Sequence, residues 1–286
     1  MALTVSHRCQ SISPSPTLAI DARAKEMKAR GVDVIGFGAG EPDFPTPQYI
    51  IDAAKEALDL GKTRYTPASG TYELRKAICD KLERDNDLFY KPQDIVVSSG
   101  AKHSLYNIFQ AIIDPGDEVL IPTPCWVSYP EMVRMAGGVP VFIPTDESTD
   151  FIPTKKDIAS RVNRRTKAMI ITSPSNPNGS VWDQDQLQFV ADLAVSHPFY
   201  VISDEIYEKL IFDGKTSITI RRCLTPSISI TKSDNPISFP KLIMPERISC
   251  LLPVFVTLVR ILRLSCQKDA LYPSSGSMIN SYLCCS

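Results

Sequence analysis

The sequence predicts an α/β protein whose mostly parallel sheet is covered by helices on both faces. Between residues 17 and 214, short apolar segments alternate with longer segments of helical periodicity, and this alternation is typical of parallel sheets. Hydrophobic residues make up 43% and charged residues 22% of the 286 residues, as in ordinary globular proteins. We therefore expect an α/β/α sandwich.

Glycine and proline mark where the expected elements begin and end. Gly31 stops the first helix, and Pro42, Pro45 and Pro47 require irregular backbone before the second. In chain order we expect a helix over 17–30, a strand over 32–37, helices over 47–60 and 71–85, a strand over 94–98, a helix over 101–113, a strand over 118–121, a helix over 126–136, strands over 139–143 and 168–172, a helix over 184–196 and a strand over 200–203.

The charge, hydropathy and cysteine patterns exclude several classes of protein. The formal net charge is -1, so nothing indicates binding to nucleic acid or to an anionic membrane. The longest apolar run, 251–264, is interrupted by Pro253, Arg260 and Arg263, whereas a membrane span needs about 20 mostly apolar residues. No apolar leader stands at the N-terminus and no CxxC pair occurs. We expect no metal site and a cytoplasmic protein with free thiols.

The run Ser99-Gly100-Ala101-Lys102 stands where an expected strand meets an expected helix. Unpaired N–H groups and the dipole at a helix N-terminus attract anions, and Gly100 would let a phosphate approach the backbone. A plain strand-to-helix turn is the alternative, because such turns are common in parallel α/β proteins.

Three other strand ends carry polar or aromatic side chains, and ligands of open α/β sheets gather at this edge. Asp204 could hold a proton on a ring nitrogen and Tyr207 could reach the same ring; a helix N-cap is the alternative role of Asp204. Asn176 precedes a Pro-Asn-Gly turn and could donate its amide to a ligand oxygen. Trp126 follows a Pro-rich loop and could stack on a flat ring, or lie in the core.

The run Gly36-Phe37-Gly38-Ala39-Gly40 does not predict a dinucleotide site. The fingerprint G-x-G-x-x-G opens a helix, whereas here the third glycine comes one position early and prolines follow. A close backbone approach to a small substrate fits Gly40 better. A G-x-S-x-G elbow and a Walker A loop are also absent from the sequence, so neither a hydrolase triad nor a P-loop is predicted.

Six runs carry a family resemblance. They are Gly40-Glu41-Pro42-Asp43-Phe44, Tyr65-Thr66-Pro67-Ala68-Ser69-Gly70, Ser99-Gly100-Ala101-Lys102, Pro122-Thr123-Pro124-Cys125-Trp126, Ser173-Pro174-Ser175-Asn176-Pro177-Asn178-Gly179 and Ser203-Asp204-Glu205-Ile206-Tyr207. In this order and at this spacing, residues 11 to 214 resemble the class I aminotransferases of fold type I, specifically the bacterial aspartate/aromatic-type branch. The resemblance implies the large-domain fold of these pyridoxal-phosphate-dependent enzymes.

The resemblance implies which residues would bind the cofactor, pyridoxal 5′-phosphate. Asp204 would keep the ring nitrogen protonated, which makes the ring an electron sink for the carbanion at the substrate α-carbon. Trp126 would stack on the same ring. The other contacts would come from Gly100, Ala101 and Lys102 at the phosphate, from Asn176 and Tyr207 at the phenolic oxygen, and from Tyr65 at the phosphate of a partner subunit's cofactor.

The resemblance also implies the substrates and the assembly. Gly40, Trp126 and Asn176 would line the pocket for an amino acid and a 2-oxo acid. Members of the family act as homodimers with shared sites. Asn178 stands where the family usually has threonine, which is a small departure.

The sequence changes character after Gly214. Residues 215–286 hold one of the 13 glycines, Gly276, and five of the 8 cysteines. The family's Schiff-base lysine, the Gly-Trp-Arg segment after it and a later carboxylate-binding arginine are not recognisable there, and Lys232 is the nearest candidate for the lysine. The break suggests a reading-frame shift or a mis-joined gene. Because the lysine anchors the cofactor and moves the α-proton, we expect almost no catalysis.

These observations divide the chain into an N-terminal arm with part of a small domain (1–45), an incomplete cofactor-binding large domain (46–214) and a tail unlike the family (215–286). The hypothesis is an aminotransferase for aspartate-like amino acids and 2-oxo acids, inactive in this chain. A non-catalytic remnant or dimerisation partner, and another fold type I enzyme such as a β-lyase, are the alternatives.

The tail also bears on stability. In the family the strands that follow the Asp204 strand lie inside the sheet, so their replacement should leave 200–203 as an unpaired apolar edge and 94–98 without a neighbour. Residues 228–231 and 254–262 could fill the two vacant positions, because their β-branched content permits strands. Otherwise we expect a poorly soluble or partly unfolded protein.

Overall fold

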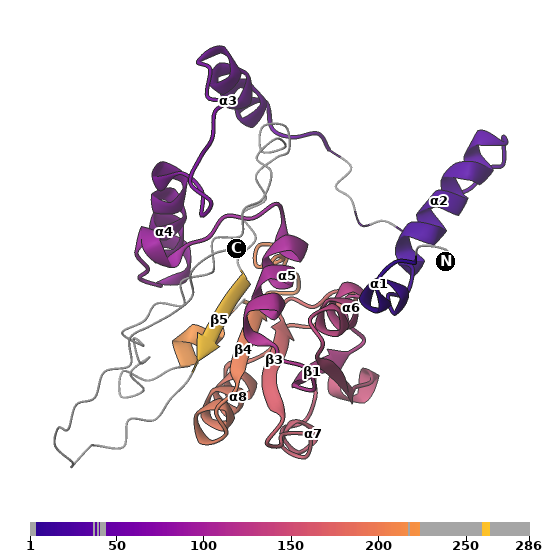
Figure 1. Cartoon of the computed structure of the whole chain (residues 1–286), viewed down its shortest axis with the longest axis vertical. Coiled ribbons are helices and arrows are strands. Elements are labelled where there is room, and N and C mark those ends of the chain that lie inside the picture. Colours follow the sequence, from indigo (N-terminus) through magenta and orange to yellow (C-terminus); the bar gives the residue numbers. More distant parts are fainter. Residues whose placement is uncertain are drawn as a thin grey trace.

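The computed structural model describes residues 4–36, 38, 40, 44–216 and 218–223, together with the backbone of 259–263. Its centre is a sheet with the strand order β2-β1-β3-β4-β5 (Figure 1). The strands are β1 (Glu118–Thr123), β2 (Val139–Pro144), β3 (Thr166–Thr172), β4 (Tyr200–Asp204) and β5 (Val259–Arg263). β1 is parallel to β2 and β3, and β3 is parallel to β4, whereas β5 is antiparallel to β4. The described sheet is therefore mostly parallel, as the sequence predicts.

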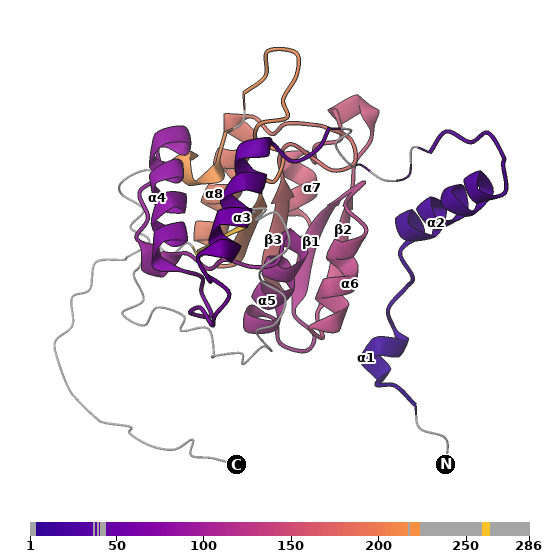
Figure 2. The same ribbon diagram turned by 90° about the horizontal axis from the view of Figure 1, so that it is seen from above.

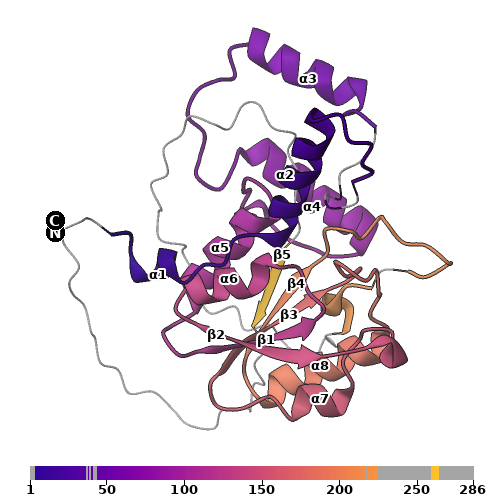
Figure 3. The same ribbon diagram turned by 90° about the vertical axis from the view of Figure 1, so that its right-hand side faces the viewer.

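Helices lie on both faces of this sheet (Figure 3). α5 (Ala101–Ile112) and α6 (Ser128–Met135) cover one face, and α7 (Lys155–Ala159) and α8 (Gln184–Ser196) cover the other. The expected α/β/α sandwich is confirmed.

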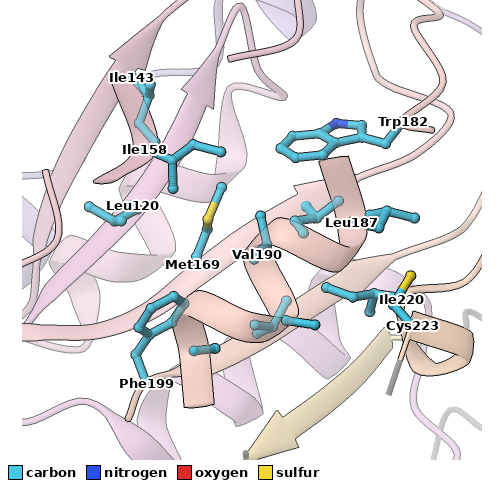
Figure 4. Close-up of a cluster of buried hydrophobic side chains, with 14 of the residues drawn as sticks. Leu120, Ile143, Ile158, Met169, Trp182, Leu187, Val190, Phe199, Ile220 and Cys223 are labelled. Atoms are coloured by element: carbon cyan, nitrogen blue, oxygen red, sulfur yellow. The ribbon is translucent and has the colours of Figure 1, made fainter. Parts of the chain in front are cut away.

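Alternation along the strands divides the core into two layers, because successive side chains of a strand point to opposite faces. In β1, Leu120 belongs to the cluster under α7 and α8, whereas Val119 and Ile121 belong to the cluster under α5 and α6. Figure 4 shows Trp182, Leu187, Val190 and Phe199 in the first of these clusters. Burial of each large apolar side chain contributes about 1.5–3 kcal/mol, so the two layers fix the position of the sheet between its helices.

The remaining helices lie outside these layers. α4 (Tyr72–Asn86) is capped by the Thr71 hydroxyl and packs Ile78 and Leu82 against Leu88 in a third, smaller cluster. α1 (His7–Gln10), α2 (Pro16–Ala29) and α3 (Gln48–Asp59) bury none of their residues. Figure 1 shows α2 and α3 standing away from the sheet, and Figure 2 shows the same for α2. Short 3-10 turns are η1 (Pro92–Asp94), η2 (Glu147–Thr149) and η3 (Ile220–Cys223).

Two expected strands do not form. Residues 32–36 are irregular, and residues 94–98 begin as the end of η1 and continue without regular structure. Ile95 has extended backbone angles, but the hydrogen bond from Val97 N to Ser69 O, 3.0 Å, is isolated and belongs to no ladder. The physical reason is that no described strand lies beside either segment. The other expected elements begin and end within about two residues of the observed ones.

The expectation that β4 would be an unpaired edge is wrong. Val259–Arg263 pairs with it along its whole length, from Tyr200 opposite Arg263 to Asp204 opposite Val259. This strand overlaps the 254–262 segment whose β-branched content permits a strand. The second candidate, 228–231, lies outside the described residues.

Among the helices of the described part, none is both long and apolar enough to cross a membrane.

Candidate functional site

The loops that follow three parallel strands lie at one edge of the sheet. β1 leads into the loop of Trp126, β3 leads into the loop of Asn176, and β4 ends in Asp204. The N-terminus of α5 lies at the same edge, because Lys102 Nζ is 5.1 Å from the centre of the Trp126 ring. The structure therefore brings together candidate residues from four separate segments, at the edge where parallel sheets bind ligands.

Asp204 is a buried carboxyl group at this edge, with 2% of its surface exposed. Its Oδ2 accepts a hydrogen bond of 2.7 Å from the Tyr129 hydroxyl, and its Oδ1 accepts one of 3.2 Å from the Ile206 N–H. Burial raises the pKa of Asp204, and these two hydrogen bonds oppose the rise without cancelling it. Residues 206–209 form a turn, so Asp204 does not cap a helix. A buried carboxyl group with a perturbed pKa in this position is typical of a functional site.

Tyr129 belongs to the same group of residues, although its sequence position alone did not indicate this. Its hydroxyl lies 2.8 Å from Thr172 Oγ1, and its ring meets the Trp126 ring edge-on, with centroids 5.3 Å apart at 88°. Burial and the neighbouring Asp204 raise the pKa of Tyr129 well above its ordinary value, so the phenol stays protonated. The spacing in the sequence could have indicated that Tyr129 lies beside Trp126. Tyr129 stands three residues after Trp126 where a helix begins, and residues three apart share a helix face.

The start of α5 has the features of an anion site. Gly100 is its N-cap residue with φ 83° and ψ 169°, a conformation that favours glycine. A Cβ at Gly100 would meet nothing within 4 Å, so the backbone angle and not crowding selects glycine. No described side chain caps the first turn, which leaves its N–H groups, from Ala101 and Lys102 onward, to face a ligand.

Asn176 and Tyr207 form the second polar pair of the edge. Asn176 Nδ2 lies 3.5 Å from the Tyr207 hydroxyl, at the outer limit of a hydrogen bond. A cavity of about 20 Å³ lies beside Asn176 and is lined also by Cys125, Tyr129 and Thr172. That volume has room for about one water molecule, so any larger ligand would bind outside this cavity, against the open edge.

Two candidate residues, Gly40 and Tyr65, are not drawn into this group. Gly40 is exposed in the segment between α2 and α3, and Tyr65 is 79% exposed between α3 and α4. No contact described for either residue reaches Asp204 or Trp126. Lys232 lies outside the described residues.

The turn that carries Tyr207 is anchored to α4 by a polar cluster. The Glu208 side chain is 15% exposed and accepts hydrogen bonds from Lys81 Nζ and, at 2.8 Å, from Asn86 Nδ2. Both donors lie on α4, far away in the sequence. The cluster therefore fixes the backbone next to Tyr207.

The cysteines and acidic residues of the described part form no metal site, since no group of three or more His, Cys, Asp or Glu side chains is placed to hold an ion. Its cysteines are free thiols: Cys9, Cys79, Cys125 and Cys223.

Curated relatives share this sequence over most of the chain. The model of the family described as aminotransferase class I and II matches residues 32–232. The aspartate aminotransferase of Bacillus sp. strain YM-2 is 50% identical over 216 residues, which cover 76% of this chain and 55% of that protein. A probable aspartate/prephenate aminotransferase of Thermus aquaticus is 48% identical over 210 residues, covering 73% and 55%. The chain thus spans about half the length of the curated relatives it matches.

Solved structures agree with this assignment. The aspartate aminotransferase of Thermus thermophilus with maleate superposes with a TM-score of 0.76 at 45% identity, covering 78% of this chain and 58% of that one. The enzyme from Rhizobium meliloti superposes with a TM-score of 0.73 at 39% identity, covering 78% and 56%. Since the family model matches well over half of the residues, this chain belongs to the class I and II aminotransferases.

Proposed function

We propose that this chain contains the cofactor-binding part of a pyridoxal-phosphate-dependent aminotransferase that exchanges amino groups between aspartate-like amino acids and 2-oxo acids. The observation that carries the proposal is the buried Asp204 at the carboxyl edge of the sheet, beside Trp126 and the uncapped N-terminus of α5. Family membership supports it, because class I aminotransferases depend on pyridoxal phosphate.

The described residues fit this cofactor chemically. A protonated ring nitrogen needs a carboxylate partner, and Asp204 has no described cation beside it that would satisfy its charge. A phosphate needs N–H donors, which the first turn of α5 supplies. A phenolic oxygen needs donors, for which the Asn176 amide and the Tyr207 hydroxyl are suited. When bound, the cofactor supplies an electron sink for the carbanion formed at the substrate α-carbon.

The chain's own residues would then divide the work of binding. Asp204 would hold the proton on the ring nitrogen, and Trp126 would stack on the ring. Gly40, with Trp126 and Asn176, would line the substrate pocket. Tyr65, exposed in this single chain, would reach the site of a second copy in a homodimer. We place this protein in the cytoplasm, because the cysteines that the structure describes are free thiols and its curated relatives include aspartate aminotransferases.

We further propose that this chain does not catalyse amino-group exchange. No Ser-Lys pair followed by Gly-Trp-Arg occurs in residues 215–286, and Lys232 stands in Thr231-Lys232-Ser233 without that sequel. The lysine of the family moves the α-proton, and general acid–base catalysis of this kind contributes about 10²–10⁴-fold. The chain would then act as a non-catalytic cofactor-binding protein or as a dimerisation partner.

Two assays on the full-length chain test these proposals. Quenching of tryptophan fluorescence should show that pyridoxal phosphate binds, that Asp204→Asn weakens binding, and that the control Asp185→Asn, on the exposed start of α8, does not. Aspartate and 2-oxoglutarate should give no amino-group exchange, and borohydride reduction followed by mass spectrometry should find no stoichiometric pyridoxyl-lysine. Turnover abolished by Lys232→Ala would overturn the second proposal, and pyruvate release instead of exchange would indicate a β-lyase.

A further inference from the structure

Tyr129 joins Asp204 to Thr172 by two short contacts. Its oxygen lies 2.7 Å from Asp204 Oδ2 and 2.8 Å from Thr172 Oγ1. A tyrosine hydroxyl has one proton to donate, and an ionised carboxylate can only accept. The Tyr129 proton therefore goes to Asp204, and Thr172 must donate its own proton to the Tyr129 oxygen. The contacts form a directed chain from Thr172 through Tyr129 to Asp204.

We propose that Tyr129 is a positioning residue that, with Thr172 behind it, keeps Asp204 ionised and oriented for pairing with a protonated ring nitrogen. This inference rests on the proposed function, because the ring nitrogen belongs to the cofactor. A hydrogen bond to the charged form of an acid favours that form, and hydrogen bonds in a chain strengthen one another. The three side chains stand on β3, α6 and β4, which are packed elements of the core.

The surroundings of Asp204 offer its carboxylate little stabilisation besides the hydrogen bond from Tyr129. Burial by itself opposes ionisation and raises the pKa of Asp204. Among the described residues no lysine or arginine contacts it, so its charge is stabilised by Tyr129 and by the Ile206 N–H.

The other titratable groups near Asp204 act less directly. Glu205 accepts a hydrogen bond of 2.8 Å from Ser203 Oγ. Cys125 lies near Tyr129 and contributes to the raised pKa of its phenol. On β5, Arg260 stands opposite Ser203 in the strand register. The hydroxyl of Tyr129 is thus the titratable group in direct hydrogen-bond contact with the Asp204 side chain in the described part of the protein.

Carbon-13 NMR of protein labelled at the aspartate carboxyls measures this effect without any ligand, with Asp204→Asn to assign the resonance. Tyr129→Phe should raise the pKa of Asp204 by about one, a tenfold change in proton affinity. Thr172→Val should raise it by less, and Thr172→Ser, which keeps the hydroxyl, should restore it. The matched control is Tyr106→Phe, a partly buried tyrosine in the same core cluster. An unchanged Asp204 titration in folded Tyr129→Phe, or in Thr172→Val if the first variant does not fold, overturns the proposal.

A second measurement connects the effect to binding. The probe is 4′-deoxypyridoxine 5′-phosphate, which has the ring nitrogen and the phosphate but no aldehyde. Its binding is measured by the quenching of tryptophan fluorescence. Tyr129→Phe should weaken its affinity about tenfold, whereas Tyr106→Phe should leave it unchanged. Equal affinities for the wild type and Tyr129→Phe would overturn the positioning role and leave the proposed function intact. No binding by the wild type would reject the cofactor site itself, and the carboxyl titration would still decide the role of Tyr129.

Discussion

Replacing Glu208 with glutamine tests whether the polar cluster on α4 holds the turn that carries Tyr207. The Glu208 carboxylate accepts from Lys81 and Asn86 and is 15% exposed. Hydrogen bonds to charged groups contribute about 1.5–3 kcal/mol, but a glutamine oxygen can still accept one, and Lys81 lies 3.9 Å from Asp85 as a second partner. We therefore expect a loss of about 1–2 kcal/mol in the free energy of unfolding, which lowers the melting temperature by about 2–8 °C.

The loss should depend on pH in a direction that the structure sets. Burial alone raises the pKa of Glu208, but the hydrogen bonds from Lys81 and Asn86 outweigh it, so its pKa in the folded protein is lower than the ordinary 4.5. The carboxylate therefore stabilises the fold above the unfolded pKa, and this contribution disappears as the pH falls through the folded pKa.

Urea unfolding followed by circular dichroism, at about pH 7 and about pH 3, measures both effects. The matched control is Glu83→Gln, the same substitution at an exposed position of α4. Near neutral pH, Glu208→Gln should be less stable than the wild type and than the control, and the difference should shrink in acid. If Glu208→Gln and Glu83→Gln are equally stable near pH 7, or if a difference persists undiminished in acid, the cluster does not stabilise the turn as described.

Three further changes test the core, a tight turn and the sheet edge. Leu120→Ala in the buried centre of β1 should cost about 2–5 kcal/mol in urea unfolding; a cost below that range would mean that the layers repack freely. Gly70→Ala should lower the melting temperature, because φ is +95° and the added Cβ would lie 2.7 Å from Val97 Cγ2; a melting temperature equal to the wild type would refute this contact. The N–H groups of successive strand residues point alternately toward and away from the neighbouring strand, so either Ile261 or Leu262 donates its N–H toward β4. Proline has no N–H, so proline at that one position should expose the edge of β4 and cause aggregation, which size-exclusion chromatography detects. Monodisperse elution of both variants would show that β5 does not protect this edge.

Hydrophobic periodicity predicts the elements of this fold well where a local signal agrees with it. α8 is expected at 184–196 and observed at Gln184–Ser196, because Asp183 and Gln186 form a capping box and the apolar residues after them share one face. The prediction of strands at 32–37 and 94–98 is wrong because composition was the only signal for them. Apolar, β-branched composition favours extended backbone, but a strand also needs a neighbour, and composition does not supply one.

The grouping of the candidate site residues at one edge of the sheet was predictable to the same degree. Asp204 ends β4, and Asn176 and Trp126 follow β3 and β1. These strands proved to be parallel and adjacent, and the carboxyl ends of such strands must meet at one edge. Tyr129 escaped detection because its role depends on a contact between residues 75 positions apart in the sequence. A tyrosine on the apolar face of a short helix is ordinarily a core residue, and its hydroxyl has meaning only once α6 and β4 are packed together.

The edge of β4 shows how far sequence arguments extend in the tail. The run 254–262 contains enough β-branched residues to form a strand, and the observed β5 includes its second half. Neither composition nor periodicity determines the direction of such a strand, because both are unchanged when it is reversed. The direction matters, since β1, β2, β3 and β4 are parallel and β5 runs against them. An antiparallel strand closes the backbone ladder of β4 but brings its carboxyl end to the opposite edge of the sheet, away from Asp204. Arg263, the last residue of β5, therefore lies at the edge opposite the candidate site, and this strand can complete the sheet without extending the row of carboxyl ends that builds the site.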